Sequence, residues 1–460
     1  MAPTQLGPTY EEMLHPQRIE AGLRSGPARE EGERSGARLF DIAWRDAERR
    51  AYVDVLPSEL TGVDAPIAVL YGRDMPTGSH KVGAAYAVLA EAVVAEGLEP
   101  GRHTCIWPST GNYGIGGAWV AAQLGFDSIV VLPESMSAER FALLRRYGSR
   151  IATTPGCESN VRQVYDRCQG LVASDPGRMR VLNQFAAFGN YRFHYYVTGN
   201  TIAQVAAELG ARGVGRGRVA AYASAMGSGG TIAAGDRLKQ LWGDALVVGV
   251  EPIQCPTLST GGYGDHQIQG IGDKHVTWIH HVHAMDAMVA VDDRECLLGL
   301  QLLTEETGWE VLTRRYGVPE DAVRRIASYV GISGVCNILA AIKTARHFRL
   351  SGNDLVVTVC TDTIDRYRST MEQLTAENGP MDEVEAAVRL VSIFHRQKAD
   401  WVHEATSTMR RRWHHLKYYT WVEQLGKTEA ELAALADPEF WLAEQARVAE
   451  VDRGIMALRG

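Results

Sequence analysis

The chain has 460 residues and a formal net charge of −8, and 45% of its residues are hydrophobic. It is long enough to bury the cores of two lobes, and its acidic balance gives no basic field for a nucleic-acid partner. Seven cysteines without paired spacing favour reduced thiols, and no apolar leader or run of about 18 apolar residues is present, so we expect a cytoplasmic protein without membrane contact.

The chain divides into segments of different pattern. Residues 1–50 are rich in Glu, Arg and Gly around one apolar cluster near Leu39 and Trp44, and they predict an N-terminal arm that packs on the body or on a second subunit. Between residues 51 and 370, strand-like runs alternate with helical patterns. This alternation predicts an α/β fold with mainly parallel twisted sheets and helices on both faces. The clearest strand-like runs are residues 67–71, 128–132, 219–225, 246–250 and 355–360.

A lysine follows a small turn after the first of these runs. The turn reads Thr77, Gly78, Ser79, His80 and Lys81, with an alanine-rich helical pattern after it. Taken alone this is a weak signal, because a lysine near a helix start is usually a solvated surface residue. Two glycine-rich segments further along the chain change that interpretation.

The first segment is Ser109, Thr110, Gly111, Asn112 and Tyr113, between a strand-like run and a helical pattern. A glycine loop at such a turn directs backbone N–H groups at a bound anion. A second loop of the same kind follows residues 219–225, and it lacks the Lys-Ser/Thr ending of a nucleotide P-loop. Together the loops predict a site for a phosphate and a second anion beside a lysine. The second loop consists of Gly227, Ser228, Gly229, Gly230 and Thr231.

Beyond residue 370 the pattern becomes helical. Residues 381–397 and 399–419 have the apolar spacing of amphipathic helices, and we expect a turn with an aromatic anchor to end this segment at residues 437–441. We therefore predict a helical C-terminal extension over residues 371–460. Within it, the basic run from Arg410 to His415 is interpreted as a solvated helix face or an intersubunit contact, in preference to a basic binding strip.

The order of lysine, asparagine loop and glycine-rich loop resembles the fold-type II pyridoxal-phosphate enzymes. The resemblance is to the cysteine synthase and cystathionine β-synthase group, within the tryptophan synthase β superfamily. It runs from about residue 65 to about residue 370. Connecting segments that share it are residues 133–148, the Asn183-Gln184-Phe185 segment, and residues 269–272 and 331–334.

The resemblance implies a cofactor, pyridoxal 5'-phosphate, and roles for individual residues. Lys81 would hold the cofactor as a Schiff base and carry the substrate α-proton. Asn112 would contact the phenolic oxygen of the cofactor, and Thr363 would face its ring nitrogen. The phosphate would bind at Gly227, Ser228, Gly229, Gly230 and Thr231. The substrate would contact Ser109, Thr110, Gly111, Tyr113, Gln184, Gly270 and Ile271.

The resemblance also implies the arrangement of lobes and subunits. Residues 51–84 and 196–370 would form a larger lobe that binds the cofactor, and residues 85–195 a smaller, mobile lobe, with the cofactor between them. A homodimer is implied as well. The expected partners are an amino-acid substrate and a small nucleophile.

The implied reaction is β-replacement on a serine-type amino acid through an aminoacrylate intermediate. An activated serine would exchange its β-substituent for sulfide, another thiol or an amine, as in a cysteine synthase-like lyase or transferase of amino-acid biosynthesis. Two alternatives stay open: β-elimination alone, as in a dehydratase or desulfhydrase, and a regulator that binds the cofactor without turnover.

Some residues depart from the pattern of the group and leave the substrates unidentified. Tyr113 stands where cysteine synthases have threonine, so a phenol would narrow the pocket or contact the substrate side chain. Asp273 follows the segment at 269–272, where a small or aromatic residue is usual, and Asp362 is interpreted as a turn or cap residue. A histidine cluster is interpreted as a polar pocket rim, and no metal site is predicted. Its members are His275, His280, His281 and His283.

Overall fold

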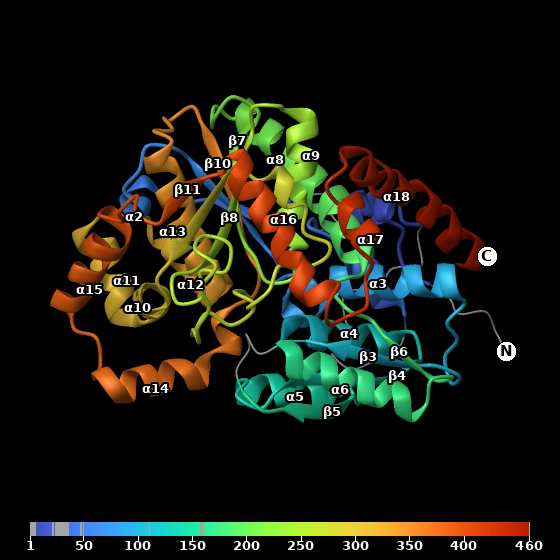
Figure 1. The fold of residues 1–460 in the computed structure, drawn as a ribbon. Helices are drawn as coiled ribbons and strands as arrows, with labels where there is room; N and C mark the ends of the chain where they lie inside the picture. The colour runs from blue at the N-terminus through green and yellow to red at the C-terminus, as the bar shows by residue number, and fades with distance from the viewer. Residues whose placement is uncertain are drawn as a thin grey trace.

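The computed structural model describes residues 6–20, 23, 36–46, 48, 50–109, 111–156 and 161–459. Two separate sheets organise these residues, and helices cover both sheets (Figure 1). The predicted α/β architecture with mainly parallel sheets and a helical C-terminal extension is confirmed. Among the described helices none is long and apolar enough to cross a bilayer.

The larger sheet has seven strands in the order β1-β2-β10-β7-β8-β9-β11. Its central pairs are parallel, whereas β1 and β11 are antiparallel edge strands. The central strands are almost fully apolar and buried because helices cover both faces of a parallel sheet. The strands are β1 (Val53–Val55), β2 (Ile67–Tyr71), β7 (Val219–Ala225), β8 (Leu246–Pro252), β9 (Ala287–Val291), β10 (Leu355–Cys360) and β11 (Val402–Glu404).

The smaller sheet has four parallel strands in the order β5-β4-β3-β6. It lies in the lower part of Figure 1, where α4 is seen on its upper side. Its strands are β3 (Thr104–Pro108), β4 (Asp127–Pro133), β5 (Arg150–Thr154) and β6 (Met179–Val181). All four fall within the range predicted for the smaller lobe, although the lobe boundaries themselves stay a prediction.

Helices before the C-terminal extension connect the strands or cover the sheets. They are α1 (Tyr10–Leu14), α2 (Ser58–Thr61), α3 (Lys81–Glu96), α4 (Asn112–Gln123), α5 (Ala138–Arg146), α6 (Val161–Ser174), α7 (Phe188–Arg192), α8 (Gly199–Ala211), α9 (Ala234–Leu241), α10 (Asp293–Thr304), α11 (Glu306–Glu310), α12 (Glu320–Tyr329) and α13 (Ile332–His347). Short 3₁₀ or π turns lie between several of them, and one of these, η8 (Ile364–Arg366), follows β10.

The C-terminal extension differs in part from its prediction. It contains α14 (Arg368–Asn378), α15 (Glu383–Arg389), α16 (Ser407–Trp421), α17 (Glu429–Ala434) and α18 (Pro438–Arg459). The amphipathic helix predicted from residue 399 begins only at Ser407, because residues 402–404 form β11 and pair with β9. Residues 437–441 do not end the extension either, since α18 continues from Pro438.

The described part of the N-terminal arm packs on the body of the protein and on the last helix. The backbone N–H of Tyr10 donates to Asp452 on α18 at 2.7 Å, and Tyr86 on α3 donates to Pro8 O at 2.8 Å. Arg459 pairs with Glu12 at 2.9 Å. The arm and the extension therefore stabilise each other at the outer face of α3. Most of residues 21–35 lie outside the described residues.

Candidate active site

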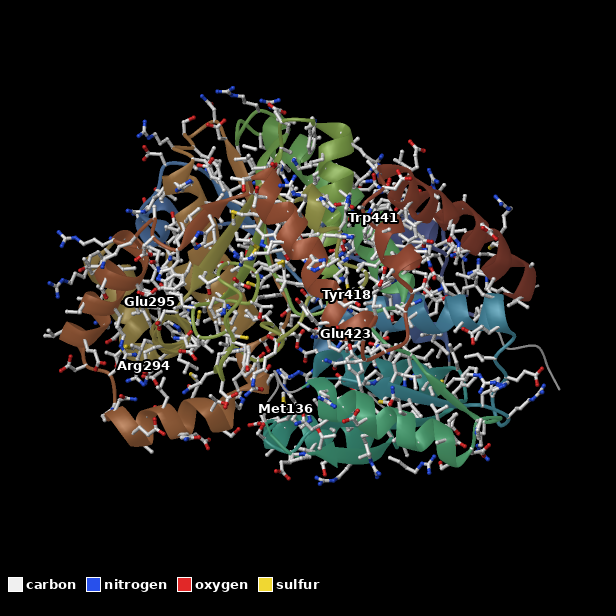
Figure 2. The ribbon with its side chains drawn as sticks, in the orientation of Figure 1. Met136, Arg294, Glu295, Tyr418, Glu423 and Trp441 are labelled. Atoms are coloured by element: carbon white, nitrogen blue, oxygen red, sulfur yellow. The ribbon has the colours of Figure 1, made fainter. Side chains whose placement is uncertain are left out.

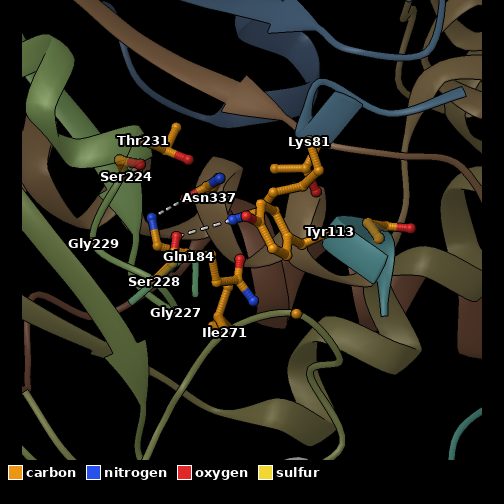
Figure 3. A pocket seen from close by; sticks show the side chains of 14 residues that line it. Lys81, Tyr113, Gln184, Ser224, Gly227, Ser228, Gly229, Thr231, Ile271 and Asn337 are labelled. Carbon is orange, nitrogen blue, oxygen red and sulfur yellow. Dashed lines mark hydrogen bonds between the residues drawn. The ribbon is translucent and has the colours of Figure 1, made fainter. Parts of the chain in front are cut away.

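A pocket lies where the carboxyl ends of β2, β7 and β10 meet the amino-terminal end of α4. In a parallel sheet the loops after these strand ends gather at one edge, which is where α/β proteins bind ligands. The pocket is lined by Lys81, Asn112, Tyr113, Gln184, Ser224, Ala225, Gly227, Ser228, Gly229, Thr231, Gly270, Ile271, Asn337 and Thr361 (Figure 3). Most of the predicted site residues are thus brought together.

Lys81 is the first residue of α3 and points across the pocket. Its Nζ lies 3.1 Å from the Oγ of Ser228, a contact drawn in Figure 3. The preceding His80 is fully buried, and its Nε2 lies 3.2 Å from the hydroxyl of Thr231. Burial, and after it the charge of Lys81, lower the pKa of His80 to about 3, so His80 is a neutral imidazole at pH 7.

The glycine-rich loop after β7 presents free backbone donors. Among the described residues, the N–H groups of Gly227, Ser228 and Gly229 have no acceptor, whereas the Gly230 N–H lies 3.4 Å from Ser228 Oγ. Buried N–H groups are normally paired, so this loop is suited to an anionic ligand that accepts from several amides at once.

Close neighbours require glycine in this loop. A Cβ at Gly227 would lie 2.7 Å from Gly270 O, and one at Gly229 would lie 2.6 Å from the Thr277 hydroxyl. A Cβ at Gly230 would lie 2.1 Å from the Oδ1 of Asn190. The loop therefore lies directly against its surroundings and leaves its amide side to the pocket.

The asparagine loop lies at the start of α4, and Thr110 within it is outside the described residues. Ser109 is fully buried, and its Oγ accepts from the N–H groups of Gly111 and Gly114 at 2.9 and 2.6 Å, so its hydroxyl shapes the loop. Ser109, Gly111 and Gly230 adjoin lining residues but do not line the pocket themselves. Asn112 lines the pocket and donates through its Nδ2 to Asp362 at 2.5 Å.

Tyr113 lines the pocket. Its hydroxyl donates to Leu182 O at 3.0 Å, and its ring packs edge-on against Trp107 on β3 of the smaller sheet. The expected narrowing by an aromatic ring is compatible with this position. The phenol donates its proton to Leu182 O, and the alternative of a polar contact between the phenol and a substrate stays a prediction.

Thr363 is not brought to the pocket. It caps η8, where its hydroxyl lies 3.2 Å from the Asp365 carboxylate, and it borders a different cavity behind the lysine turn. Thr361, directly after β10, lines the pocket instead, with its hydroxyl 2.9 Å from that of Ser333. The interpretation of Asp362 as a turn or cap residue is also wrong, since Thr363 is the cap and the Asp362 side chain is buried.

Gln184, Gly270 and Ile271 also line the pocket. Asp273 follows this segment and is buried; burial raises its pKa to about 7, and the charge of Lys81 acts in the opposite direction. Its carboxyl group is therefore partly protonated at neutral pH.

Sequence reasoning missed several polar residues that organise the pocket. Asn190 donates through Nδ2 both to Gln184 O and to Ser228 Oγ, at 2.9 Å each. Asn337, in the mostly apolar α13, accepts from the Ala225 N–H at 2.7 Å and donates to Val359 O at 2.6 Å, so it joins the ends of β7 and β10. A polar side chain in a buried helix is the signal that would have found Asn337. A polar side chain at the carboxyl end of a buried parallel strand, or directly after it, is the signal for Ser224 and Thr361.

One face of α16 holds the long loop that forms the outer wall of the pocket. This loop, residues 253–286, has almost no regular structure, so its buried carbonyls need other donors. Tyr418 and Glu423, near the end of α16, lie in the middle of the view in Figure 2, above Met136, which follows β4. Side chains of α16 donate hydrogen bonds to these loop carbonyls: Arg412 Nη2 and Trp413 Nε1 to Leu258 O, Lys417 Nζ to Trp278 O and His280 O, and Trp421 Nε1 to Val276 O.

These contacts correct the prediction for the run from Arg410 to His415. Arg410 donates to Met285 O at 2.8 Å, and Trp413 is fully buried, so part of the run binds this chain's own loop rather than solvent or another subunit. Thr277 in the same loop donates to Ser228 O at 2.8 Å. The extension is thereby connected to the glycine-rich loop of the pocket.

The histidine cluster does not gather around one point. Burial lowers the pKa of His275 to about 4, and its ring lies 3.2 Å from the Tyr165 hydroxyl. His281 instead lies 2.7 Å from Asp236 and stacks on Trp441. In the parts of the chain that the structure describes, no group of three or more His, Cys, Asp or Glu side chains could hold a metal ion.

The residues present fit a phosphate-bearing aldehyde cofactor. The free amides at residues 227–229 suit its phosphate, and the tight contacts at Gly229 and Gly230 leave no room for side chains there. Lys81 supplies an amine at the same loop, 3.1 Å from Ser228. Lys81, Asn112 and the loop at 227–231 are the residues that would hold the cofactor.

Comparison with known proteins agrees with this geometry. The chain matches the family described as "Pyridoxal-phosphate dependent enzyme" over residues 60–313. A protein named probable cysteine synthase from Bacillus subtilis (strain 168) is 32% identical over 296 residues, which cover 64% of this chain and 86% of that protein. Cysteine synthase B of Campylobacter jejuni is 28% identical over 296 residues, covering 64% of this chain and 87% of the relative.

Solved structures share the fold. A cysteine synthase from Entamoeba histolytica superposes with a TM-score of 0.63 at 20% identity, covering 82% of this chain and 99% of that chain. An O-ureido-L-serine synthase superposes with a TM-score of 0.59 at 24% identity, covering 73% of this chain and 95% of that chain. Each superposition leaves part of this chain without an equivalent in the solved structure.

Proposed function

Because this chain belongs to the family of pyridoxal-phosphate dependent enzymes, we propose that it catalyses β-replacement on an activated serine, with sulfide, another thiol or an amine as the nucleophile. The observation that carries the proposal is the 3.1 Å contact between Lys81 Nζ and Ser228 Oγ inside the pocket that Asn112 and Ile271 also line. The relatives named cysteine synthase support the substrate class.

Bound pyridoxal phosphate acts as an electron sink that stabilises negative charge at the Cα of an amino acid. We assign the proton transfers at Cα to Lys81 Nζ, which removes the α-proton and returns it once the nucleophile has added at Cβ. The neutral His80 adds no second positive charge at this end of the pocket, because its pKa is lowered to about 3.

We assign phosphate binding to the amides of Gly227, Ser228 and Gly229, which need no cationic side chain. We assign the substrate carboxylate to the start of α4, where the positive end of the helix dipole and the loop N–H groups favour an anion. Thr361 replaces Thr363 in our assignment of the hydroxyl that faces the ring nitrogen, because Thr361 is the one that lines the pocket. A hydroxyl there in place of a carboxylate favours replacement and elimination over transamination.

The proposal is tested by supplying the purified enzyme with O-acetyl-L-serine and sodium sulfide. β-Replacement forms a C–S bond as the C–O bond to acetate breaks, so cysteine and acetate are expected in equal amounts. A Lys81→Ala variant, which keeps the rest of the pocket, should form neither. Accumulation of pyruvate and ammonia while sulfide is present would reject replacement in favour of elimination, and no turnover of any β-substituted serine would reject both.

We also propose that the enzyme is a homodimer that acts in the cytoplasm. The resemblance to cysteine synthases supports both points. Light scattering on the eluting protein tests the first point, with twice the chain mass of 50.4 kDa as the expected result.

A further inference from the structure

Asp362 is the centre of a buried polar network beside the pocket. It follows Thr361 at the end of β10 and is 1% exposed. Its Oδ2 accepts from Asn112 Nδ2 at 2.5 Å and from the Tyr367 hydroxyl at 2.6 Å. Arg140, with no exposed surface, lies 3.9 Å from the same oxygen through Nη2 and donates to the Tyr367 hydroxyl at 3.1 Å.

The absence of a side chain at Gly331 leaves room for the Asp362 carboxylate. A Cβ at Gly331 would lie 2.3 Å from Asp362 Oδ1 and 2.9 Å from the ring of Tyr367. A buried carboxylate persists only where cations and donors compensate for its lost hydration. Arg140 supplies the opposite charge here, and Asn112 and Tyr367 supply the donors.

The carboxylate determines which way the Asn112 amide faces. A carboxylate accepts hydrogen bonds and cannot donate, so it favours the amide orientation that directs the NH₂ group toward it. The opposite orientation would place two acceptor oxygens in contact. In the favoured orientation, one Asn112 N–H is bound to Asp362 and the second remains for the pocket that Asn112 lines.

The same network joins the two sheets of the molecule. Asn112 and Arg140 belong to α4 and α5, beside the smaller sheet, whereas Asp362 and Tyr367 follow β10 of the larger sheet. Neighbouring contacts run the same way. Ser137 Oγ donates to Arg366 O at 3.0 Å, and Glu139 accepts from the N–H and the hydroxyl of Ser369 at 3.0 Å each. Asp362 is therefore placed to couple the orientation of Asn112 to the contact between the lobes.

We propose that Asp362 is a positioning residue for the reaction. It fixes the Asn112 amide with an N–H toward the bound cofactor and, with Arg140, holds α4 and α5 against the end of β10. The inference rests on the proposed function in one respect, namely that Asn112 acts on the bound cofactor. The contact between the lobes does not depend on which substrate is used.

The experiment compares the holoenzyme with an Asp362→Asn variant, which keeps the size of the side chain but can also donate. We expect the visible absorbance of the bound cofactor to shift and kcat to fall by roughly tenfold or more with a smaller change in KM, as loss of a hydrogen bond to a charged group implies. Amide hydrogen exchange in residues 112–123 and 138–146 should rise in the same variant. The control, Asp365→Asn, removes an equal charge from the half-exposed side chain three residues away and should change none of these.

A second variant covers the case in which Asp362→Asn does not fold. Gly331→Ala keeps the carboxylate but displaces it, so it should produce the same spectral shift and faster exchange in α4 and α5. Wild-type absorbance, kcat and exchange in either folded variant would overturn the inference. If the wild-type enzyme converts no activated serine, the proposed function fails, but the exchange comparison still tests Asp362, because it requires no turnover.

Discussion

Replacing Lys417 tests whether α16 holds the outer wall of the pocket. Lys417 has no exposed surface, and its Nζ donates to Trp278 O at 2.9 Å and to His280 O at 2.7 Å. Burial lowers the pKa of this amine well below its usual range. Methionine at 417 would fill the space of the aliphatic stem and leave both carbonyls without this donor.

The size of the effect follows from these two bonds. A buried acceptor left without a partner costs about 1–3 kcal/mol, so two carbonyls cost about 2–6 kcal/mol. Removing the buried amine also removes its desolvation cost, which offsets part of that loss. We therefore expect Lys417→Met to lower the free energy of unfolding by about 2–4 kcal/mol.

The matched control is Arg411→Met on the exposed face of the same helix, where the only described bond of Arg411 is to Thr408 at 3.3 Å. It should change stability by less than about 0.5 kcal/mol. Urea unfolding followed by fluorescence measures stability, and hydrogen exchange in residues 276–281 reports the loop directly. Because Thr277 donates to Ser228 O, the Lys417 variant should also retain less cofactor after dialysis than the control. Equal unfolding midpoints and equal loop exchange in the two variants would refute this reasoning.

Three further predictions address single positions. Thr361→Val should lower kcat because Thr361 lines the pocket, whereas Thr363→Val should leave kcat unchanged and lower the free energy of unfolding by about 1 kcal/mol, because the cap of η8 is lost. The reverse result for kcat would restore Thr363 to the site. Gly230→Ala should abolish cofactor retention on a gel-filtration column, because its Cβ would lie 2.1 Å from Asn190 Oδ1, and retention at the wild-type level would contradict the tight fit. Burial raises the pKa of Asp452 to about 6, above its ordinary value of 3.8, so between these values the native state binds a proton that the unfolded state has lost, and the free energy of unfolding should fall as pH rises from about 4 to about 6. Asp452→Asn should flatten this pH dependence when stability is measured by urea unfolding, and an unchanged slope would show that another group causes the pH dependence.

The central strands and the pocket loops were predictable because their causes are local. The runs at 67–71, 219–225 and 355–360 coincide with β2, β7 and β10, since strands covered on both faces are continuously apolar. The lysine turn and the glycine loop follow β2 and β7 directly, so sequence order alone brings them to one edge of the sheet.

Other features depend on residues far apart in the sequence. Which of Thr361 and Thr363 faces the pocket depends on where η8 begins, a shift of two residues that no periodicity specifies. Residues 402–404 become a strand only because β9 offers an edge. The bonds from Lys417 to Trp278 O and from Asn112 to Asp362 join positions separated by more than 100 residues, so these polar side chains gave no local sign of those buried partners.

The most direct test of Lys81 as the cofactor-binding lysine is borohydride reduction of the purified protein followed by peptide mass spectrometry. We expect a pyridoxyl group on the peptide that contains Lys81, and none on any peptide of a Lys81→Ala variant treated in the same way. A pyridoxyl group on a different lysine of the wild-type protein, or on no peptide at all after incubation with excess pyridoxal phosphate, would contradict this role of Lys81.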